Sequence, residues 1–140
     1  KENKKNISFN LDLKNEICEV LVNKNKLLQA FLNLIDNSIS IAKNNTKILL
    51  KSEINNNQFV VIKIYDQGKK INIGDKDKIF QRFYSDRDDN KEQHTGLGLS
   101  IAREIIISFK GSLELTETDN QDYLGACFMV KLPLKARQAS

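Results

Sequence analysis

The sequence predicts an α+β domain built as a two-layer sandwich, in which a mixed five-stranded sheet carries about three helices on one face. Three observations predict this fold class. Segments with the alternating pattern of β-strands occur along the chain, two segments have the spacing of amphipathic helices, and the order is strand, helix, hairpin, loop, helix, hairpin. The 140 residues suffice for one hydrophobic core but not for two.

The elements of the first half follow from periodicity. Residues 8–13 alternate polar and apolar side chains, which predicts a half-buried strand. Residues 25–42 are expected to form a long amphipathic helix, because apolar side chains recur on one helical face. These apolar residues are Leu28, Phe31, Leu32, Ile35, Ile39 and Ala42. Residues 48–54 and 59–65 are β-rich runs separated by three asparagines, which predicts a hairpin.

The second half is expected to repeat the pattern of a helix followed by a hairpin. After a turn-rich loop over residues 66–77, a short helix is expected at 78–83 and a second strong helix at 99–109, with Gly111 placed to end it. The last two strands are expected at 112–118 and 126–132. We interpret residues 1–6 as a linker remnant, 7–134 as the folded domain and 135–140 as a tail.

Composition and charge narrow the function classes only a little. The net charge of +4 is compatible with a polyphosphate ligand, an acidic partner or nucleic acid. Nucleic acid is the weakest of these, because the chain has no interleaved basic and aromatic cluster. Cys18 and Cys127 have no metal-ligand spacing, which favours two reduced thiols. No apolar run approaches the roughly 18 residues of a membrane span, so any such span is expected outside these residues.

Two polar motifs interrupt otherwise apolar elements. Asn33 and Asn37 lie four residues apart in the first helix and therefore project from the same side. They are either surface amides or a site at which an amide oxygen coordinates a hard cation such as magnesium. Asp66 and Gly68 follow a β-patterned run. This pair is either a common turn or a site where the carboxylate accepts a hydrogen bond from an exocyclic amine and the glycine admits a ring.

A third motif, residues 95–100, opens the second helix with the sequence Thr-Gly-Leu-Gly-Leu-Ser. Glycines before a helix expose backbone N–H groups beside the positive end of the helix dipole, which suits phosphate oxygens. The motif has neither the lysine nor the spacing of a Walker A loop. Alone, it is also compatible with a generic glycine-rich loop.

The three motifs in this order resemble the asparagine box and the two glycine boxes of sensor histidine kinases, within the superfamily of gyrase, Hsp90 and MutL ATPases. The resemblance covers residues 9–134 and implies a Bergerat-type ATP-binding fold. Residues 79–84 are similar to the phenylalanine box, and residues 125–128 are similar to the glycine-containing start of the last strand. The run 82–87 resembles that of ChvG-type sensor kinases.

The resemblance implies a role for each motif. Asn37 would hold magnesium on the triphosphate, Asn33 would belong to the same catalytic box, and Asp66 would bind the adenine amine. The remaining nucleotide contacts implied are Gly68, Lys70, Arg82, Tyr84, Thr95, Gly96, Leu97, Gly98 and Leu99. The implied partners are a dimerisation and phosphoacceptor domain outside this fragment and a downstream response regulator. The implied parent is a homodimeric sensor anchored in the inner membrane, with this domain in the cytoplasm.

Departures from the family pattern keep other functions open. Lys70 replaces a glycine of the first glycine box, and Ser40 and Ile41 replace a basic and an aromatic residue. A degenerate pseudokinase module is therefore one alternative. A gyrase- or Hsp90-like ATPase is another, but those hydrolases resemble one another in having a glutamate where this chain has Asn33, and an amide is no general base. If Lys70 needs a left-handed backbone, the cost is on the order of 1 kcal/mol, and we expect several-fold weaker ATP binding than with glycine.

Overall fold

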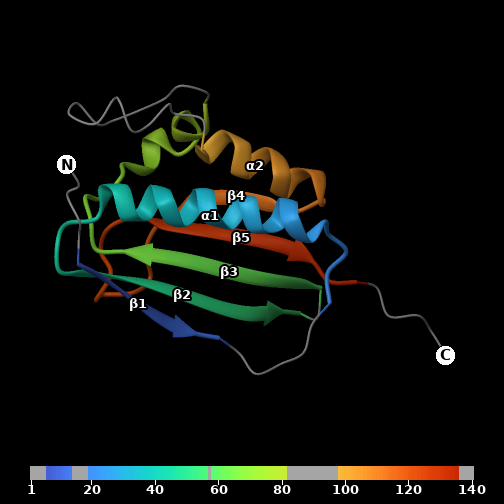
Figure 1. Cartoon of the computed structure of the whole chain (residues 1–140), viewed down its shortest axis with the longest axis horizontal. Helices are drawn as coiled ribbons and strands as arrows, with labels where there is room; N and C mark the ends of the chain where they lie inside the picture. The colour runs from blue at the N-terminus through green and yellow to red at the C-terminus, as the bar shows by residue number, and fades with distance from the viewer. Residues whose placement is uncertain (1–5, 14–18, 57, 82–97, 136–140) are drawn as a thin grey trace.

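The computed structural model of the chain describes residues 6–13, 19–56, 58–81 and 98–135. Five strands form one mixed sheet in the order β1-β2-β3-β5-β4 (Figure 1). β1 pairs with β2 in parallel, and the other pairs are antiparallel. The strands are β1 Ile7–Asp12, β2 Thr46–Asn55, β3 Phe59–Asp66, β4 Ser112–Thr116 and β5 Cys127–Pro133. The expected fold class and the mixed five-stranded sheet are confirmed.

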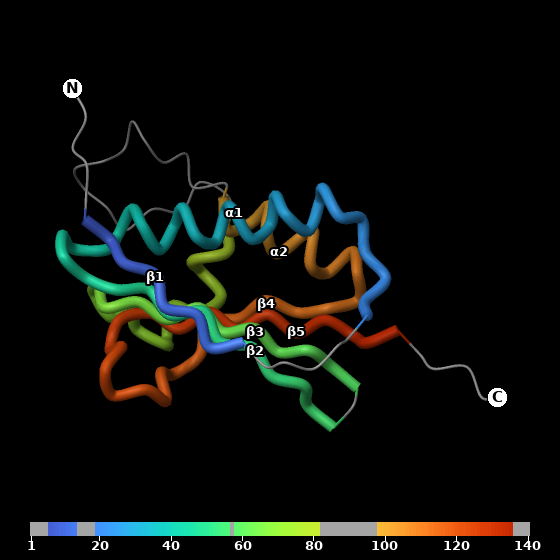
Figure 2. The backbone as a smooth tube through the Cα atoms, turned by 60° about the horizontal axis from the view of Figure 1, so that its bottom comes forward, coloured from blue at the N-terminus to red at the C-terminus, as the bar shows by residue number. Residues whose placement is uncertain are grey.

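Two α-helices, α1 (Lys24–Ile41) and α2 (Gly98–Ser108), cover one face of the sheet (Figures 1 and 2). α1 directs Ala30, Leu34 and Ser38 toward the sheet at four-residue spacing. Its first turn is capped by Asn23, whose side chain accepts a hydrogen bond from the Lys26 N–H at 3.0 Å. The core between the layers is aliphatic and aromatic, and includes Ile48, Ile64, Ile106 and Phe128.

The expected short helix is the main departure from the prediction. Residues 73–75 and 78–80 form two 3₁₀ turns, η1 (Ile73–Asp75) and η2 (Lys78–Phe80), so the described residues contain two α-helices instead of about three. η2 ends at Phe80 because Gln81 is already extended. Both Ile79 and Phe80 are buried, so this turn anchors the loop to the core.

The end of α2 also differs in detail from the expectation. The left-handed residue is Lys110, with φ of 65°, and not Gly111. The N–H groups of Lys110 and Gly111 return to the carbonyls of Ile107 and Ile106, which is the Schellman pattern. Gly111 is needed for another reason: a Cβ there would lie 2.2 Å from the Lys131 carbonyl oxygen.

The opposite face of the sheet is partly covered by the loop between β4 and β5, which lies below the sheet in Figure 2. Tyr123 in this loop forms a second apolar cluster with Leu49, Tyr65 and Cys127. The Tyr65 hydroxyl donates to Asp119 Oδ1 at 2.6 Å. The loop is therefore held against the sheet, and it brings the start of β5 to the end of β3.

Candidate nucleotide-binding site

Asp66, the last residue of β3, is a fully buried carboxylate. Its Oδ1 accepts hydrogen bonds from the backbone N–H groups of Gly68 at 2.9 Å and Ala126 at 3.0 Å. Its Oδ2 is buried and has no hydrogen-bond partner among the described residues. Burial raises the pKa of Asp66, and the two N–H donors oppose that rise. A buried oxygen without a donor destabilises the fold, so this carboxylate is suited to accept a hydrogen bond from a ligand.

Two glycines leave room around this carboxylate. A Cβ on Gly125 would lie 2.0 Å from Asp66 Oδ1 and 2.7 Å from the Gly68 nitrogen. A Cβ on Gly68 would lie 2.9 Å from the carbonyl oxygen of Ile41, at the end of α1. Gly125 and Ala126 also exchange backbone hydrogen bonds with Asp66, at 3.0 and 3.1 Å. The last turn of α1, the end of β3 and the start of β5 therefore meet around Asp66.

The two asparagines lie on the half of α1 nearest this junction. Asn33 Nδ2 donates to the carbonyl oxygen of Gly98 at 3.3 Å, which joins α1 to the first residue of α2. Asn37 follows one turn later and is half-buried, and its carbonyl oxygen accepts a hydrogen bond from the Ser40 hydroxyl at 2.8 Å. The structure thus places Asn33 against Gly98, and Asn37 one turn closer to the end of α1 that Gly68 approaches.

The second glycine motif is described only from Gly98 onward. Gly98 is the exposed first residue of α2, and a Cβ there would meet no atom within 4 Å. Leu99 is half-buried and packs against the core. The other predicted nucleotide contacts lie outside the described residues; they are Arg82, Tyr84, Thr95, Gly96 and Leu97.

Lys70 does not have the backbone that the sequence led us to expect. Among the described non-glycine residues, positive φ occurs at Asn45, Asn56 and Lys110, so Lys70 is not in the left-handed region. The expected cost of a left-handed lysine was therefore wrong. The Lys70 Nζ lies 3.7 Å from Glu117 Oε2, and both side chains are more than 60% exposed. Such an ion pair is screened by solvent and is weak.

Gln67 is a structural residue that sequence reasoning missed. Its Oε1 accepts from the Lys47 N–H and its Nε2 donates to the Asp122 carbonyl oxygen, both at 2.8 Å. These bonds tie the loop after Asp66 to β2 and to the loop between β4 and β5. The role of the Ala126 N–H as a donor to Asp66 was also missed, because it depends on how two distant strands align.

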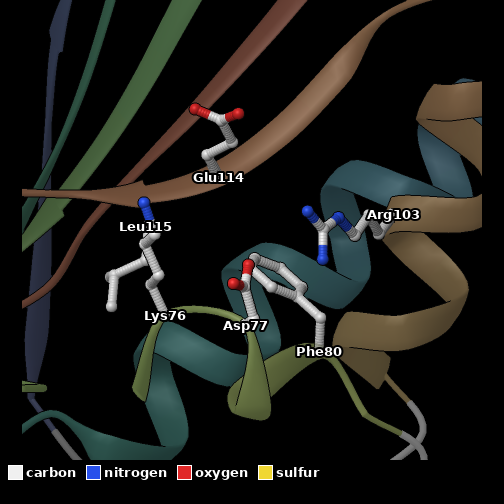
Figure 3. A pocket seen from close by; sticks show the side chains of 6 residues that line it. All are labelled: Lys76, Asp77, Phe80, Arg103, Glu114 and Leu115. Atoms are coloured by element: carbon white, nitrogen blue, oxygen red, sulfur yellow. The ribbon is translucent and has the colours of Figure 1, made fainter. Parts of the chain in front are cut away.

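A separate shallow hollow lies beside α2, η2 and β4 (Figure 3). It is lined by Lys76, Asp77, Phe80, Arg103, Glu114 and Leu115. The Arg103 guanidinium lies 4.5 Å from the centre of the Phe80 ring, which also packs edge-on against Phe128. Of the predicted site residues that the structure describes, none lines this hollow. Phe80, one of the described residues of the run similar to the phenylalanine box, therefore has a packing role.

The described residues contain no group of three or more His, Cys, Asp or Glu side chains arranged to hold a metal ion. They also contain no helix that is long and apolar enough to cross a membrane.

Comparison with known sequences agrees with this geometry. The family model described as "Histidine kinase-, DNA gyrase B-, and HSP90-like ATPase" matches residues 22–136. The signal transduction histidine-protein kinase ArlS of Staphylococcus aureus (strain USA300) is 37% identical over 115 residues, which are 81% of this chain and 25% of that protein. The chain thus spans about a quarter of the length of this curated relative.

Comparison with solved structures gives the same family. The nucleotide-free catalytic domain of histidine kinase ThkA is 30% identical, with a TM-score of 0.74 over 91% of this chain and 80% of that one. A mycobacterial sensor histidine kinase, MprB, has a TM-score of 0.79 at 21% identity over 94% and 84% of the two chains, a likeness of fold alone. ThkA in complex with the response regulator TrrA is 27% identical, with a TM-score of 0.74 over 92% of this chain and 34% of that one.

Proposed function

Because this chain belongs to the family of histidine kinase-, DNA gyrase B- and HSP90-like ATPases, we propose that it is the catalytic domain of a sensor histidine kinase. It binds Mg-ATP and donates the γ-phosphoryl group to a histidine on a separate dimerisation and phosphoacceptor domain. The observation that carries the proposal is the buried Asp66 carboxylate: its Oδ1 packs against the glycines at 68 and 125, while its Oδ2 has no donor among the described residues.

Each part of the site has one task in this proposal. Asp66 Oδ2 accepts a hydrogen bond from the exocyclic amine of adenine, and Gly68 and Gly125 keep the surrounding backbone close. The amide oxygen of Asn37 is a ligand of the type that magnesium prefers. Magnesium, when bound, neutralises charge on the triphosphate during transfer. The start of α2 at Gly98 offers the positive end of a helix dipole to the phosphates.

The remaining predicted contacts belong to this proposal as well. Leu99 at the start of α2 is assigned a nucleotide contact, and Lys70, which is exposed beside Glu117, is assigned only a weak contact that solvent screens. Arg82, Tyr84, Thr95, Gly96 and Leu97 are proposed to complete it from the sequence between η2 and α2.

A kinase fits the site better than a hydrolase does. Asn33 occupies the position where a water-activating glutamate is implied for the gyrase-like ATPases, and an amide cannot take a proton from water. Instead, Asn33 Nδ2 donates to the carbonyl oxygen of Gly98 and positions the start of α2. With an amide at this position, the γ-phosphoryl group awaits a nucleophile from another domain.

The partners in this proposal follow from the same role. The domain, residues 7–134, is part of a longer sensor that is homodimeric and anchored in the inner membrane, with this domain in the cytoplasm. A response regulator receives the phosphoryl group from the histidine, as the complex of ThkA with the response regulator TrrA leads us to expect.

The decisive experiment combines binding and transfer. The chain is titrated with a non-hydrolysable ATP analogue with and without magnesium, and is then mixed with radiolabelled ATP and the phosphoacceptor domain of its parent protein. We expect magnesium-dependent binding and an acid-labile label on the phosphoacceptor histidine only when both domains are present. Binding without transfer would favour a nucleotide-sensing module, and rapid phosphate release would favour a gyrase-like ATPase.

A further inference from the structure

Ser38 differs from two other helical serines of this chain. The hydroxyls of Ser40 and Ser108 donate to the carbonyl oxygens three residues earlier, at 2.8 and 2.6 Å. Ser38 is fully buried on the side of α1 that faces the sheet, yet its hydroxyl has no hydrogen-bond partner among the described residues. A buried hydroxyl without a partner destabilises the fold, which suggests a role other than packing.

The only other buried side-chain oxygen or nitrogen without a partner in the described ranges is Asp66 Oδ2. Both atoms belong to the same end of the interface between α1 and the sheet. Asp66 pairs with Ile48, a residue of the core under the helices. Gly68, two residues after Asp66, lies close to the carbonyl oxygen of Ile41. Ile41 in turn lies less than one helical turn beyond Ser38. Two unsatisfied polar atoms thus lie on facing elements at the nucleotide site.

Their chemistry complements one edge of adenine. That edge presents an amine donor at position 6 beside an acceptor nitrogen, N1, while guanine presents an acceptor oxygen beside an N–H donor. An ionised carboxylate can only accept, and a serine hydroxyl can donate. The pair therefore matches adenine, whereas guanine would place its oxygen against the Asp66 carboxylate.

We propose that Ser38 is a second base-specificity residue, whose hydroxyl supplies the hydrogen bond to N1 of adenine, directly or through one water, while Asp66 Oδ2 accepts from the amine. The inference rests on the proposed ATP-binding function and adds a residue that the motifs did not contain. It assigns the unsatisfied hydroxyl to ligand recognition.

The test compares ATP with 1-deaza-ATP, in which a C–H group replaces N1, by calorimetric titration in magnesium. The wild-type chain is expected to bind 1-deaza-ATP about three- to tenfold more weakly than ATP, as for the loss of one hydrogen bond. Ser38→Ala is expected to weaken ATP binding by a similar factor and to bind 1-deaza-ATP no more weakly than the wild type does. Ser108→Ala, which removes a hydroxyl that donates within α2, is the matched control and should keep the wild-type difference.

Thermal unfolding of the ligand-free proteins separates recognition from packing. Ser38→Ala should unfold at the same or a higher temperature than the wild type, because it removes an unsatisfied buried group. A lower unfolding temperature together with an undiminished preference for ATP over 1-deaza-ATP would overturn the inference and leave the ATP proposal intact. Failure of the wild-type chain to bind ATP at all would overturn both.

Discussion

At the scale of single residues, Asp66 shows a conflict between stability and binding. The carboxylate is fully buried, and its Oδ2 has no partner among the described residues. Desolvation raises its pKa, so the folded state holds this proton more tightly than the unfolded chain does. The charged form therefore lowers the stability of the folded state once the pH exceeds the ordinary pKa of an aspartate, and the deficit grows until the pH passes the raised pKa.

The first prediction concerns Asp66→Asn. We expect ATP affinity to fall by about ten- to a hundredfold, as for loss of a hydrogen bond to a charged group. The ligand-free variant should unfold at the same or a higher temperature than the wild type at pH 7. This difference in unfolding temperature should shrink as the pH falls through the raised pKa of the wild-type Asp66 carboxyl. Calorimetric titration and thermal unfolding at several pH values check both. Unchanged affinity in a folded variant would contradict the adenine assignment.

The second prediction concerns the metal. In Asn37→Ala, binding of ATP in magnesium should weaken roughly tenfold, while binding in a chelator should change by less than about twofold, because an amide ligand acts only through the ion. Titrations in the two buffers measure this difference directly. Equal losses in both buffers would assign Asn37 a packing role instead.

Lys70 gives the third prediction, which the structure changes from the sequence-based one. Since its backbone is not left-handed and its ammonium lies 3.7 Å from Glu117, both the strain and the specific contact are small. We expect Lys70→Gly to alter ATP affinity by less than about twofold at moderate salt. Parallel titrations of the two proteins at one salt and magnesium concentration decide it. A change of tenfold in either direction would show that Lys70 contacts the nucleotide or obstructs it.

At the scale of elements, the glycines at 98 and 125 have different reasons to be glycine. A Cβ on Gly98 at the start of α2 meets no atom within 4 Å, whereas a Cβ on Gly125 before β5 would lie 2.0 Å from Asp66 Oδ1. The described residues therefore do not require glycine at position 98. They do require it at position 125, because β3 and β5 meet there without room for a Cβ.

The fourth prediction follows from this contrast. Gly98→Ala should leave the free energy of unfolding unchanged or raise it by up to about 1 kcal/mol, because alanine favours a helix, yet it should weaken ATP binding several-fold if phosphates approach the backbone there. Gly125→Ala should lower the free energy of unfolding by about 1–3 kcal/mol through overpacking. Urea denaturation with nucleotide titration separates the two. Equal destabilisation by both changes would be inconsistent with the packing described.

At the scale of the whole molecule, the described residues form one layered domain with the proposed ATP site at one end of its helix–sheet interface. The chain spans a quarter of the curated relative ArlS. In the proposed function, the γ-phosphoryl group passes to a histidine on a separate domain, and positioning between the domains would supply much of the rate.

The fifth prediction is that the isolated chain neither labels itself nor hydrolyses ATP quickly. It presents no phosphoacceptor motif in its sequence, and Asn33 offers no base for water. Incubation with radiolabelled ATP should leave the protein unlabelled and release phosphate close to the background rate. Fast phosphate release that depends on Asn33 would support the function of a gyrase-like ATPase.

Much of the fold could be predicted from the sequence alone, because helical and strand periodicity and short motifs are local properties. The long helix expected at 25–42 lies at Lys24–Ile41, the hairpin of β2 and β3 is where the asparagines predicted it, and the sheet is mixed. Spacing and resemblance also named Asn33, Asn37 and Asp66 as site residues, and their roles are proposals. Local patterns of this kind predict the structure of a segment correctly where tertiary packing does not override the segment's own propensity.

Only the tertiary structure decided what surrounds those residues. The contact of Asn33 with Gly98 spans 65 residues, and the hydrogen bond from Ala126 to Asp66 spans 60. Neither can be read from local pattern, because each depends on how β3, β5 and the helices align. For the same reason, the left-handed residue is Lys110 instead of Gly111, and Ser38, an ordinary serine in the sequence, has a buried hydroxyl without a partner among the described residues.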